Sequence, residues 1–148
     1  MPHSYVANWI HIIWTTKSRS RCLMADSALR VRDHLIAEAA KINSQIEVII
    51  IQPEHVHILV NLTATQTLDD FVHQLKGESS HWVNDQKIIR GRFNWQKGYG
   101  AFSVSVSMLE TVKHYIQNQE EHHRRKTFLE EYKEFLDKHG FVYDDENR

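Results

Sequence analysis

Two histidines separated by one residue lie in an otherwise apolar stretch. His55 and His57 belong to "PEHVHILVNL" (53–62), whose β-branched and apolar residues predict a strand. Side chains alternate across a strand, so both imidazoles face one side, about 6.5–7 Å apart, while Val56 and Ile58 face the other. Two neutral imidazoles on one face can bind a single metal ion. A pair of hydrogen-bonded sheet histidines would give the same pattern, so both interpretations stay open.

A tyrosine and a glutamine form a second candidate pair. In "VKHYIQNQ" (112–119), Tyr115 and Gln119 are one helical turn apart on the face that also carries Val112 and Ile116. The two side chains can therefore point at the same object. A tyrosine on an apolar stripe is usually a core residue whose hydroxyl finds a partner. A buried amide on the same stripe also needs polar partners, which leaves a site near this helix open.

Two further segments mix aromatic residues with Lys, Ser and Gln. They are "HQLKGESSHW" (73–82) and "FNWQKGYG" (93–100). Aromatic rings stack on bases while Lys and Ser contact phosphates, which is how proteins usually hold single-stranded nucleic acid. Loop aromatics also cap hydrophobic cores, so these segments alone do not decide between the two roles.

Four strands and four helices are expected to position these groups. Strands are predicted over residues 5–16, 45–51, 54–61 and 101–107. Helices are predicted over 27–43, from Leu68 through Trp82, over 108–121 and over 127–139. The last of these opens on a capping box between Thr127 and Glu130.

This order predicts an α+β fold. Its first six elements match the split βαβ, ferredoxin-like (RRM-like) arrangement, a four-stranded antiparallel sheet with helices on one face. The C-terminal helices, which carry Tyr115, are additional. The other face of the sheet must be covered by these helices or by a partner. With no repeat or linker, and only two prolines and five glycines, residues 1–148 are expected to form a single domain.

Composition excludes several classes of protein. The 148 residues are 41% hydrophobic and 25% charged, which is typical of a soluble globular domain. No apolar run approaches the roughly 20 residues of a membrane helix, and the N-terminus lacks the pattern of a signal peptide. The single cysteine, Cys22, rules out an internal disulfide and favours a reducing, cytoplasmic setting. The net charge of −1 gives no bulk support for binding nucleic acid.

Together these segments resemble the HUH single-tyrosine transposase family, the IS200-like enzymes of the smallest bacterial insertion sequences and their REP-associated relatives. "QPEHVHILV" is similar to the family's His-hydrophobic-His strand, although Glu54 stands where Asp is more common, and "YIQNQ" is similar to its Tyr-x-x-x-Gln helix. The segments "HIIWTTKSR", "LKGESSHWVN" and "WQKGYGAFSVS" also resemble the family. The resemblance extends over residues 5–143 and implies a transposase of a bacterial or archaeal cytoplasm.

The resemblance implies a specific chemistry. His55, His57 and the amide oxygen of Gln119 would bind one Mg²⁺ or Mn²⁺ ion, which acts as a Lewis acid on the scissile phosphate. Tyr115 would be the nucleophile, activated by its surroundings because a free phenol has a pKa of about 10. The product would be a 5′-phosphotyrosine link and a free 3′-OH. The expected function is therefore cleavage and rejoining of single-stranded DNA at hairpin-bearing element ends, without ATP.

The resemblance also implies partners. Many relatives are homodimers in which the tyrosine helix reaches the other subunit's histidine pair and the fourth strand pairs with its mate. Hairpin-bearing single-stranded DNA would need local phosphate neutralisation. The residues expected to contact DNA are Lys17, Arg19, Arg21, Lys76, Arg92, Trp95 and Lys97.

Three other functions are compatible with parts of the sequence. A domesticated relative would keep the strand cleavage but act on chromosomal repeats. A non-catalytic RRM-like module would bind nucleic acid through aromatics on its central strands, where this chain has His55 and His57. A two-histidine phosphoesterase would need a second His-x-polar motif, which "FVHQL" and "VKHYI" do not supply.

Overall fold

The computed structural model describes residues 4–144, so the ends of the expected 1–148 domain lie outside the described residues. The strands are β1 Trp9–Thr15, β2 Ile46–Ile51, β3 His55–Asn61 and β4 Gly100–Ser103. The helices are α1 Ala25–Lys41, α2 Leu68–Asp85, α3 Leu109–Gln117, α4 Gln119–Arg125 and α5 Phe128–Lys138, with short 3₁₀ turns η1 Lys17–Arg19 and η2 Val106–Met108.

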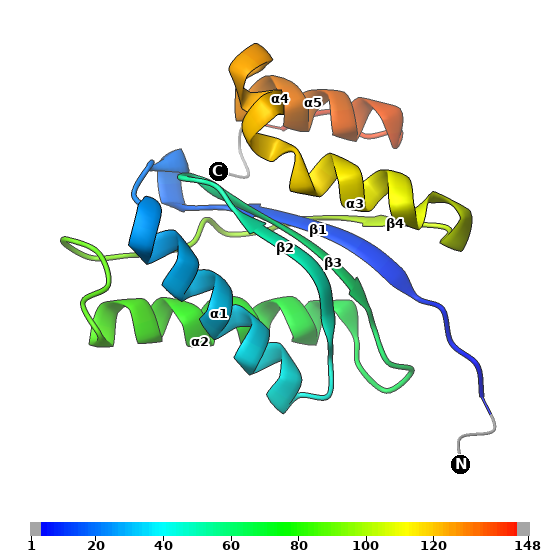
Figure 1. Ribbon diagram of the computed structural model, residues 1–148, viewed down its shortest axis with the longest axis horizontal. Helices are drawn as coiled ribbons and strands as arrows, with labels where there is room; N and C mark the ends of the chain where they lie inside the picture. The colour runs from blue at the N-terminus through cyan, green and yellow to red at the C-terminus, as the bar shows by residue number, and fades with distance from the viewer. Residues whose placement is uncertain (1–3, 145–148) are drawn as a thin grey trace.

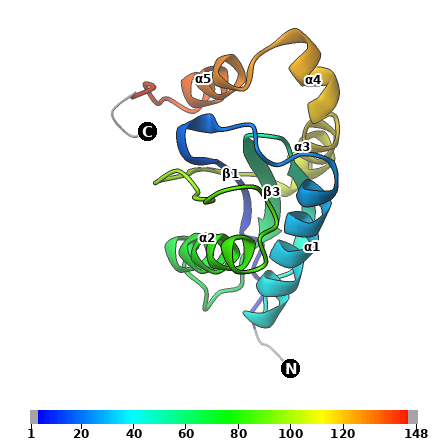
Figure 2. The ribbon, with the colours of Figure 1, turned by 90° about the vertical axis from the view of Figure 1, so that its left-hand side faces the viewer.

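The strands form one antiparallel sheet in the order β2-β3-β1-β4, which confirms the predicted ferredoxin-like α+β fold. Helices α1 and α2 lie on one face of the sheet, and α3, α4 and α5 lie on the other (Figure 1). The view turned by 90° shows the same three layers (Figure 2). The second face, which the sequence left to a partner or to the extra helices, is therefore covered by the chain's own C-terminal helices.

The two central strands separate an apolar face from a polar one. Val56, Ile58 and Val60 of β3 are fully buried in the main core, which α1 and α2 complete, as the alternation predicted. His55 and His57 point to the opposite face. In β1, Ile13 is paired with His57, so the side chains at every second position of β1 reach the same face as the two histidines.

A second, smaller core holds α5 against that face. Ile13, Phe102 and Phe128 form it, with the partly buried Tyr132 and Phe135 packed against them. The capping box predicted for this helix is present, because Thr127 accepts a hydrogen bond from the Glu130 amide while the Glu130 carboxylate accepts one from the Thr127 amide. The helix is thereby fixed over the histidines of β3.

Three predicted elements differ most from the structure. The strand expected over 5–16 begins only at Trp9. The strand expected over 101–107 ends at Ser103, because its partner β1 begins at Trp9 and offers only one further hydrogen bond, to Val104. The helix expected over 108–121 begins at Leu109 and is broken at Asn118, whose φ of −99° and ψ of 25° separate α3 from α4. Tyr115 and Gln119 therefore lie on different helices.

Among the described residues, no helix is both long and apolar enough to cross a lipid bilayer.

Candidate functional site

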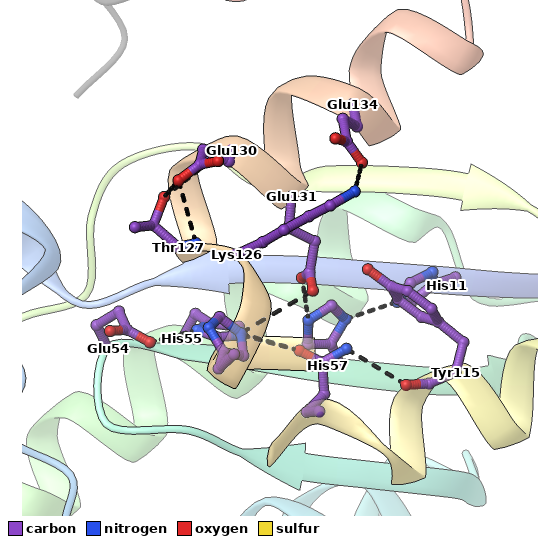
Figure 3. A network of polar contacts seen from close by, with 12 residues as sticks. His11, Glu54, His55, His57, Tyr115, Lys126, Thr127, Glu130, Glu131 and Glu134 are labelled. Atoms are coloured by element: carbon purple, nitrogen blue, oxygen red, sulfur yellow. Dashed lines mark hydrogen bonds and ion pairs between the residues drawn. The ribbon is translucent and has the colours of Figure 1, made fainter. Parts of the chain in front are cut away.

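The histidine pair lies at the centre of a closed polar cluster. His55 and His57 are both 0% exposed. Figure 3 shows that Tyr115 from α3 and Glu131 from α5 point toward them from the covering helices, and that His11 joins them from β1. Five side chains from four different elements therefore converge on one point above β3.

His55 is oriented by a carboxylate. Its Nδ1 lies 2.7 Å from Oε1 of Glu54, which in turn forms a close ion pair with Arg21. A neutral imidazole that donates a hydrogen bond from Nδ1 has its lone pair on Nε2. The contact with Glu54 therefore orients His55 so that the lone pair of Nε2 points into the cluster. Burial acts to raise the pKa of the Glu54 carboxyl, but the hydrogen bond from His55 and the electrostatic interactions with His55 and Arg21 outweigh it and lower the pKa. Glu54 is thus an anionic acceptor.

His57 is oriented by another histidine. Nε2 of His11 lies 2.8 Å from Nδ1 of His57, and the two rings stack at a centroid distance of 5.1 Å. Burial lowers the pKa of both imidazoles well below the usual value, and their proximity adds to this effect for His11. Both rings are therefore neutral at physiological pH, the form in which histidine binds metal ions.

Gln119 faces His55 from α4. Its Oε1 atom lies 3.4 Å from Nε2 of His55 and 3.2 Å from Nε2 of His123, while its Nε2 atom donates to the backbone oxygen of Tyr115 at 3.4 Å. The amide oxygen is thus the atom presented to the histidine pair, and the side chain is 0% exposed. Because the helix is broken at Asn118, Tyr115 lies on α3 and Gln119 lies on α4. The Gln119 side chain nevertheless points into the site.

Four polar atoms in the cluster have no hydrogen-bond partner among the described residues. They are Nδ1 of His11, Nε2 of His57, Oε1 of Glu131 and the hydroxyl of Tyr115. Nε2 of His57 and Oε1 of Glu131 are 3.3 Å apart but are not aligned for a hydrogen bond. Buried polar atoms are nearly always paired, so unpaired atoms that converge on one point indicate a missing ligand.

The tyrosine hydroxyl is held in its neutral form by these surroundings. The Tyr115 ring lies edge-on to His57 at 6.0 Å and to His11 at 6.2 Å. Burial raises the pKa of the Tyr115 phenol far above its ordinary value, and the negative charge of Glu131 raises it further. A phenolate at this position therefore needs a positive charge nearby.

The donor set fits a divalent cation. Nε2 of His55 lies 3.4 Å from the amide oxygen of Gln119, and Nε2 of His57 lies 3.3 Å from Oε1 of Glu131. In each pair, two electron-rich atoms lie next to each other. Atoms that bind one ion at about 2.1 Å lie about 3.0–3.4 Å apart, which matches these separations. The ligand atoms of His55, His57 and Glu131 all lie within 4.8 Å of one another.

A model of the transposase family described as IS200-like matches residues 4–119, most of the chain. The chain belongs to the IS200-like transposase family. The ISDra2 transposase TnpA of Deinococcus radiodurans is 29% identical over 114 residues, which cover 74% of this chain and 81% of that protein.

Two solved transposase structures share the fold. A crystal structure of a transposase from Deinococcus radiodurans superimposes with a TM-score of 0.64 at 25% identity, covering 80% of this chain and 95% of that one. A REP-associated tyrosine transposase bound to a REP hairpin superimposes with a TM-score of 0.62, covering 83% of this chain and 73% of that one. At 16% identity the second similarity shows the fold alone.

The family match ends at Gln119, but the cluster also contains Glu131, which lies after that residue in the chain. Sequence reasoning missed His11, His123 and Glu131, each of which lies within 4 Å of a predicted site residue. His11 stands at an alternating position of the first strand, which was a usable signal. Glu131 and His123 lie beyond short-range patterns, because only the packing of α4 and α5 onto the sheet brings them to β3.

Four of the predicted DNA contacts of this transposase lie on adjoining surface segments. Lys17 and Arg19 belong to η1, and Arg92 and Lys97 belong to the loop before β4. The two segments are held together by a hydrogen bond from the Lys17 amide to Asn94 and by a bridge between Thr16 and Trp95. Lys17, Arg92 and Lys97 are exposed and Arg19 is half-buried. We call these four residues the basic ledge.

The other three predicted DNA contacts have partners within the protein. Trp95 is 8% exposed, packs edge-on against Trp14 and donates its indole N–H to Ser79 at 2.8 Å, so in this structure its ring is a core side chain and little of it is open to a DNA base. Lys76 donates hydrogen bonds to the backbone oxygens of Gln96 and Gly98 at 2.6 and 2.7 Å, so it connects α2 to the loop before β4. Arg21 pairs with Glu54, behind the histidine site.

Proposed function

We propose that this transposase cleaves and rejoins single-stranded DNA at hairpin-bearing ends, with Tyr115 as nucleophile and a divalent ion, Mg²⁺ or Mn²⁺, held by His55, His57 and Gln119. The observation that carries the proposal is the convergence of these four side chains, three of them fully buried, on one point. A structural histidine pair would have its nitrogen atoms satisfied, whereas Nε2 of His57 has no hydrogen-bond partner among the described residues.

Tyr115 would carry out the covalent step of this reaction. The Tyr115 oxygen loses its proton and attacks the phosphorus atom, and the bond from phosphorus to the 3′-oxygen breaks. The 3′-oxygen leaves with a proton as a free hydroxyl, and the phosphate stays on Tyr115 as a 5′-phosphotyrosine. The reverse attack by a 3′-hydroxyl rejoins the strands without ATP. When bound, the ion supplies Lewis acidity to the phosphate and positive charge that favours the phenolate.

The residues around the ligands hold the site ready. Glu54 and His11 fix the ring orientations of His55 and His57, and the neutral state of His57 makes Nε2 available as a ligand. The buried position of the cluster excludes water, which strengthens electrostatic stabilisation of the transition state. The basic ledge would neutralise phosphates along the bound strand. A hairpin as substrate is supported by the REP-associated transposase, which shares the fold and was solved with a hairpin.

A homodimer belongs to the same proposal. Strand β4 is an outer strand of the sheet, and the chain that follows it exposes Val106 and Met108, which are 62% and 47% exposed. An unpaired edge next to exposed apolar side chains is suited to pairing with a second copy. A solution mass equal to that of a monomer, in a preparation that still cleaves DNA, would contradict this part.

The proposal is tested by trapping the covalent intermediate. A pool of single-stranded DNAs, each with one hairpin stem and varied flanks, is labelled at the 3′ end and incubated with the protein and Mn²⁺. The 3′ label should migrate with the protein on a denaturing gel, and a peptide containing Tyr115 should carry the nucleotide. A 5′ label should instead stay on a free fragment whose 3′-OH a polymerase can extend.

Matched tyrosine variants decide the nucleophile. Tyr115→Phe should lose the adduct completely, while Tyr132→Phe, which alters a partly buried tyrosine of α5 outside the histidine cluster, should keep it. An adduct that persists in Tyr115→Phe assigns the chemistry to another residue. Binding of the same DNA without any adduct or metal dependence would favour the non-catalytic module.

A further inference from the structure

Glu131 is a buried carboxylate that the IS200-like family match does not reach. It is 6% exposed, lies on α5, and directs Oε1 to within 3.3 Å of Nε2 of His57. Figure 3 shows its carboxylate pointing from α5 toward the space between His55 and His57. Oε1 has no hydrogen-bond partner among the residues that the structure describes.

Oε1 of Glu131 is not compensated within the described chain. Two imidazoles lie beside the carboxylate: Nε2 of His57 is 3.3 Å from Oε1, and Nε2 of His123 is 4.0 Å from Oε2. The first contact is not aligned for a hydrogen bond, and the second is too long for one. A buried carboxylate oxygen without a hydrogen-bonding partner is costly. A cation bound beside Oε1 would remove that cost.

From this geometry we propose that Glu131 is a metal ligand, so that the ion of this transposase is held by two imidazoles, one amide oxygen and one carboxylate. The inference rests on the proposed function, since it concerns the same ion. It predicts a harder site than His55, His57 and Gln119 alone would form, because carboxylate oxygens suit Mg²⁺ and Mn²⁺ while imidazoles suit Zn²⁺ and Cu²⁺. It also makes α5 part of the metal site.

The alternative is that Glu131 only adds negative charge near the site or accepts a hydrogen bond from Tyr115. These roles differ in their geometric demand. A ligand must place its oxygen within about 2.1 Å of the ion, whereas an electrostatic effect is retained when the carboxylate is withdrawn by one methylene group. Glu131→Asp keeps the charge and shortens the reach, and Glu131→Gln keeps the shape and removes the charge.

The first measurement is Mn²⁺ affinity by calorimetric titration of the full chain, without DNA. All variants are made in a His34→Ala background, which removes a second His–Glu–Glu cluster formed by His34, Glu38 and Glu78 on the opposite face of the sheet. Glu131→Gln and Glu131→Asp should each weaken Mn²⁺ binding about tenfold or more. Glu134→Gln is the matched control: it removes a carboxylate of the same helix that pairs with Lys126, and should leave the affinity unchanged.

The second measurement is the visible absorption of bound Co²⁺, which reports the number and type of ligands. Both Glu131 variants should change the intensity or position of the bands, and Glu134→Gln should not. Circular dichroism of the metal-free proteins checks folding. If Glu131→Asp fails to fold, the isosteric Glu131→Gln carries the test through the Co²⁺ spectrum.

The outcomes separate this inference from the proposed function. If His57→Ala abolishes Mn²⁺ binding while both Glu131 variants bind with the original affinity and Co²⁺ spectrum, Glu131 is not a ligand and the histidine site stands. If Glu131→Gln binds Mn²⁺ more tightly, Glu131 competes with the ion and the inference fails. If His57→Ala also binds normally, no ion occupies this cluster, and both the inference and the proposed metal site fail.

Discussion

Nε2 of His11 lies 2.8 Å from Nδ1 of His57, so a residue of the first strand decides which nitrogen of the third-strand histidine faces the site. The contact joins adjacent strands within the sheet and does not depend on the covering helices. It gives the proposed ion site an orienting partner on each histidine, Glu54 for His55 and His11 for His57.

We therefore expect His11→Phe to lower Mn²⁺ affinity by about 10- to 100-fold, the range typical of partners that orient a metal-binding histidine. Phenylalanine fits the aromatic surroundings that Phe102 and Phe135 provide, so the fold should persist. Calorimetric titration measures the affinity. An unchanged affinity in a folded variant would show that His57 does not depend on this contact.

Trp95 should contribute to stability and not to DNA binding. Trp95→Ala removes a large core side chain and leaves Ser79 without its indole donor, so it should lower the free energy of unfolding by about 3–5 kcal/mol. Trp95→Phe keeps most of the ring volume but loses the hydrogen bond, and should cost about 1–3 kcal/mol. Urea denaturation measures both values. Weakened DNA binding by Trp95→Phe without a loss of stability would restore the stacking role.

Lys76 should make stability rise with pH in the alkaline range. Burial lowers the pKa of its ammonium group to about 8 in the folded chain, below the value of about 10.4 in an unfolded chain. Between these two values the unfolded chain binds more protons, so the free energy of unfolding increases as pH rises from about 8 to about 10.4.

The comparison that isolates this effect is with Lys76→Met, because other lysines and tyrosines titrate in the same range. The difference in unfolding free energy between the original protein and Lys76→Met should shift in favour of the original protein across that window. A difference that stays constant with pH would mean that the lysine keeps its ordinary pKa despite its position under the loop.

The basic ledge should carry the salt dependence of DNA binding. Lys97→Ala and Arg92→Ala should each weaken binding of a single-stranded hairpin and reduce the slope of log K against log salt by about 0.7 per lost contact. Arg30→Ala, an exposed change on helix α1, is the matched control. Equal slopes for all three variants would place the DNA elsewhere.

The fold could be predicted because its signals are local. Alternation in "HVHILV" gave the two faces of β3, and the Thr127 capping box gave the start of α5. The break at Asn118 was missed because Tyr115 and Gln119 have ideal helical spacing, and the contact that accompanies the break, between the buried Gln119 amide and His55, is a tertiary one. Asparagine has weak helix propensity, which makes the interruption inexpensive.

The site could be predicted only in part, for a related reason. His55, His57, Tyr115 and Gln119 stand in short motifs, so their types and spacings are visible along the chain. Glu131 stands in "FLEEY", where it reads as one of several solvated helix charges. Its burial comes from the docking of α5 through Phe128, which stacks on His55 at 4.1 Å. Such a contact depends on tertiary packing that no local pattern encodes.

The two cores differ in size, and this difference sets how the site is reached. The sheet and helices α1 and α2 share the large core, whereas α5 is anchored through the small one around Ile13, Phe102 and Phe128. Segments that bury less apolar surface detach at lower free energy than the body of the fold. With α5 seated, His55 and His57 have no contact with solvent. A DNA strand could therefore reach these histidines only after α5 has detached from the small core.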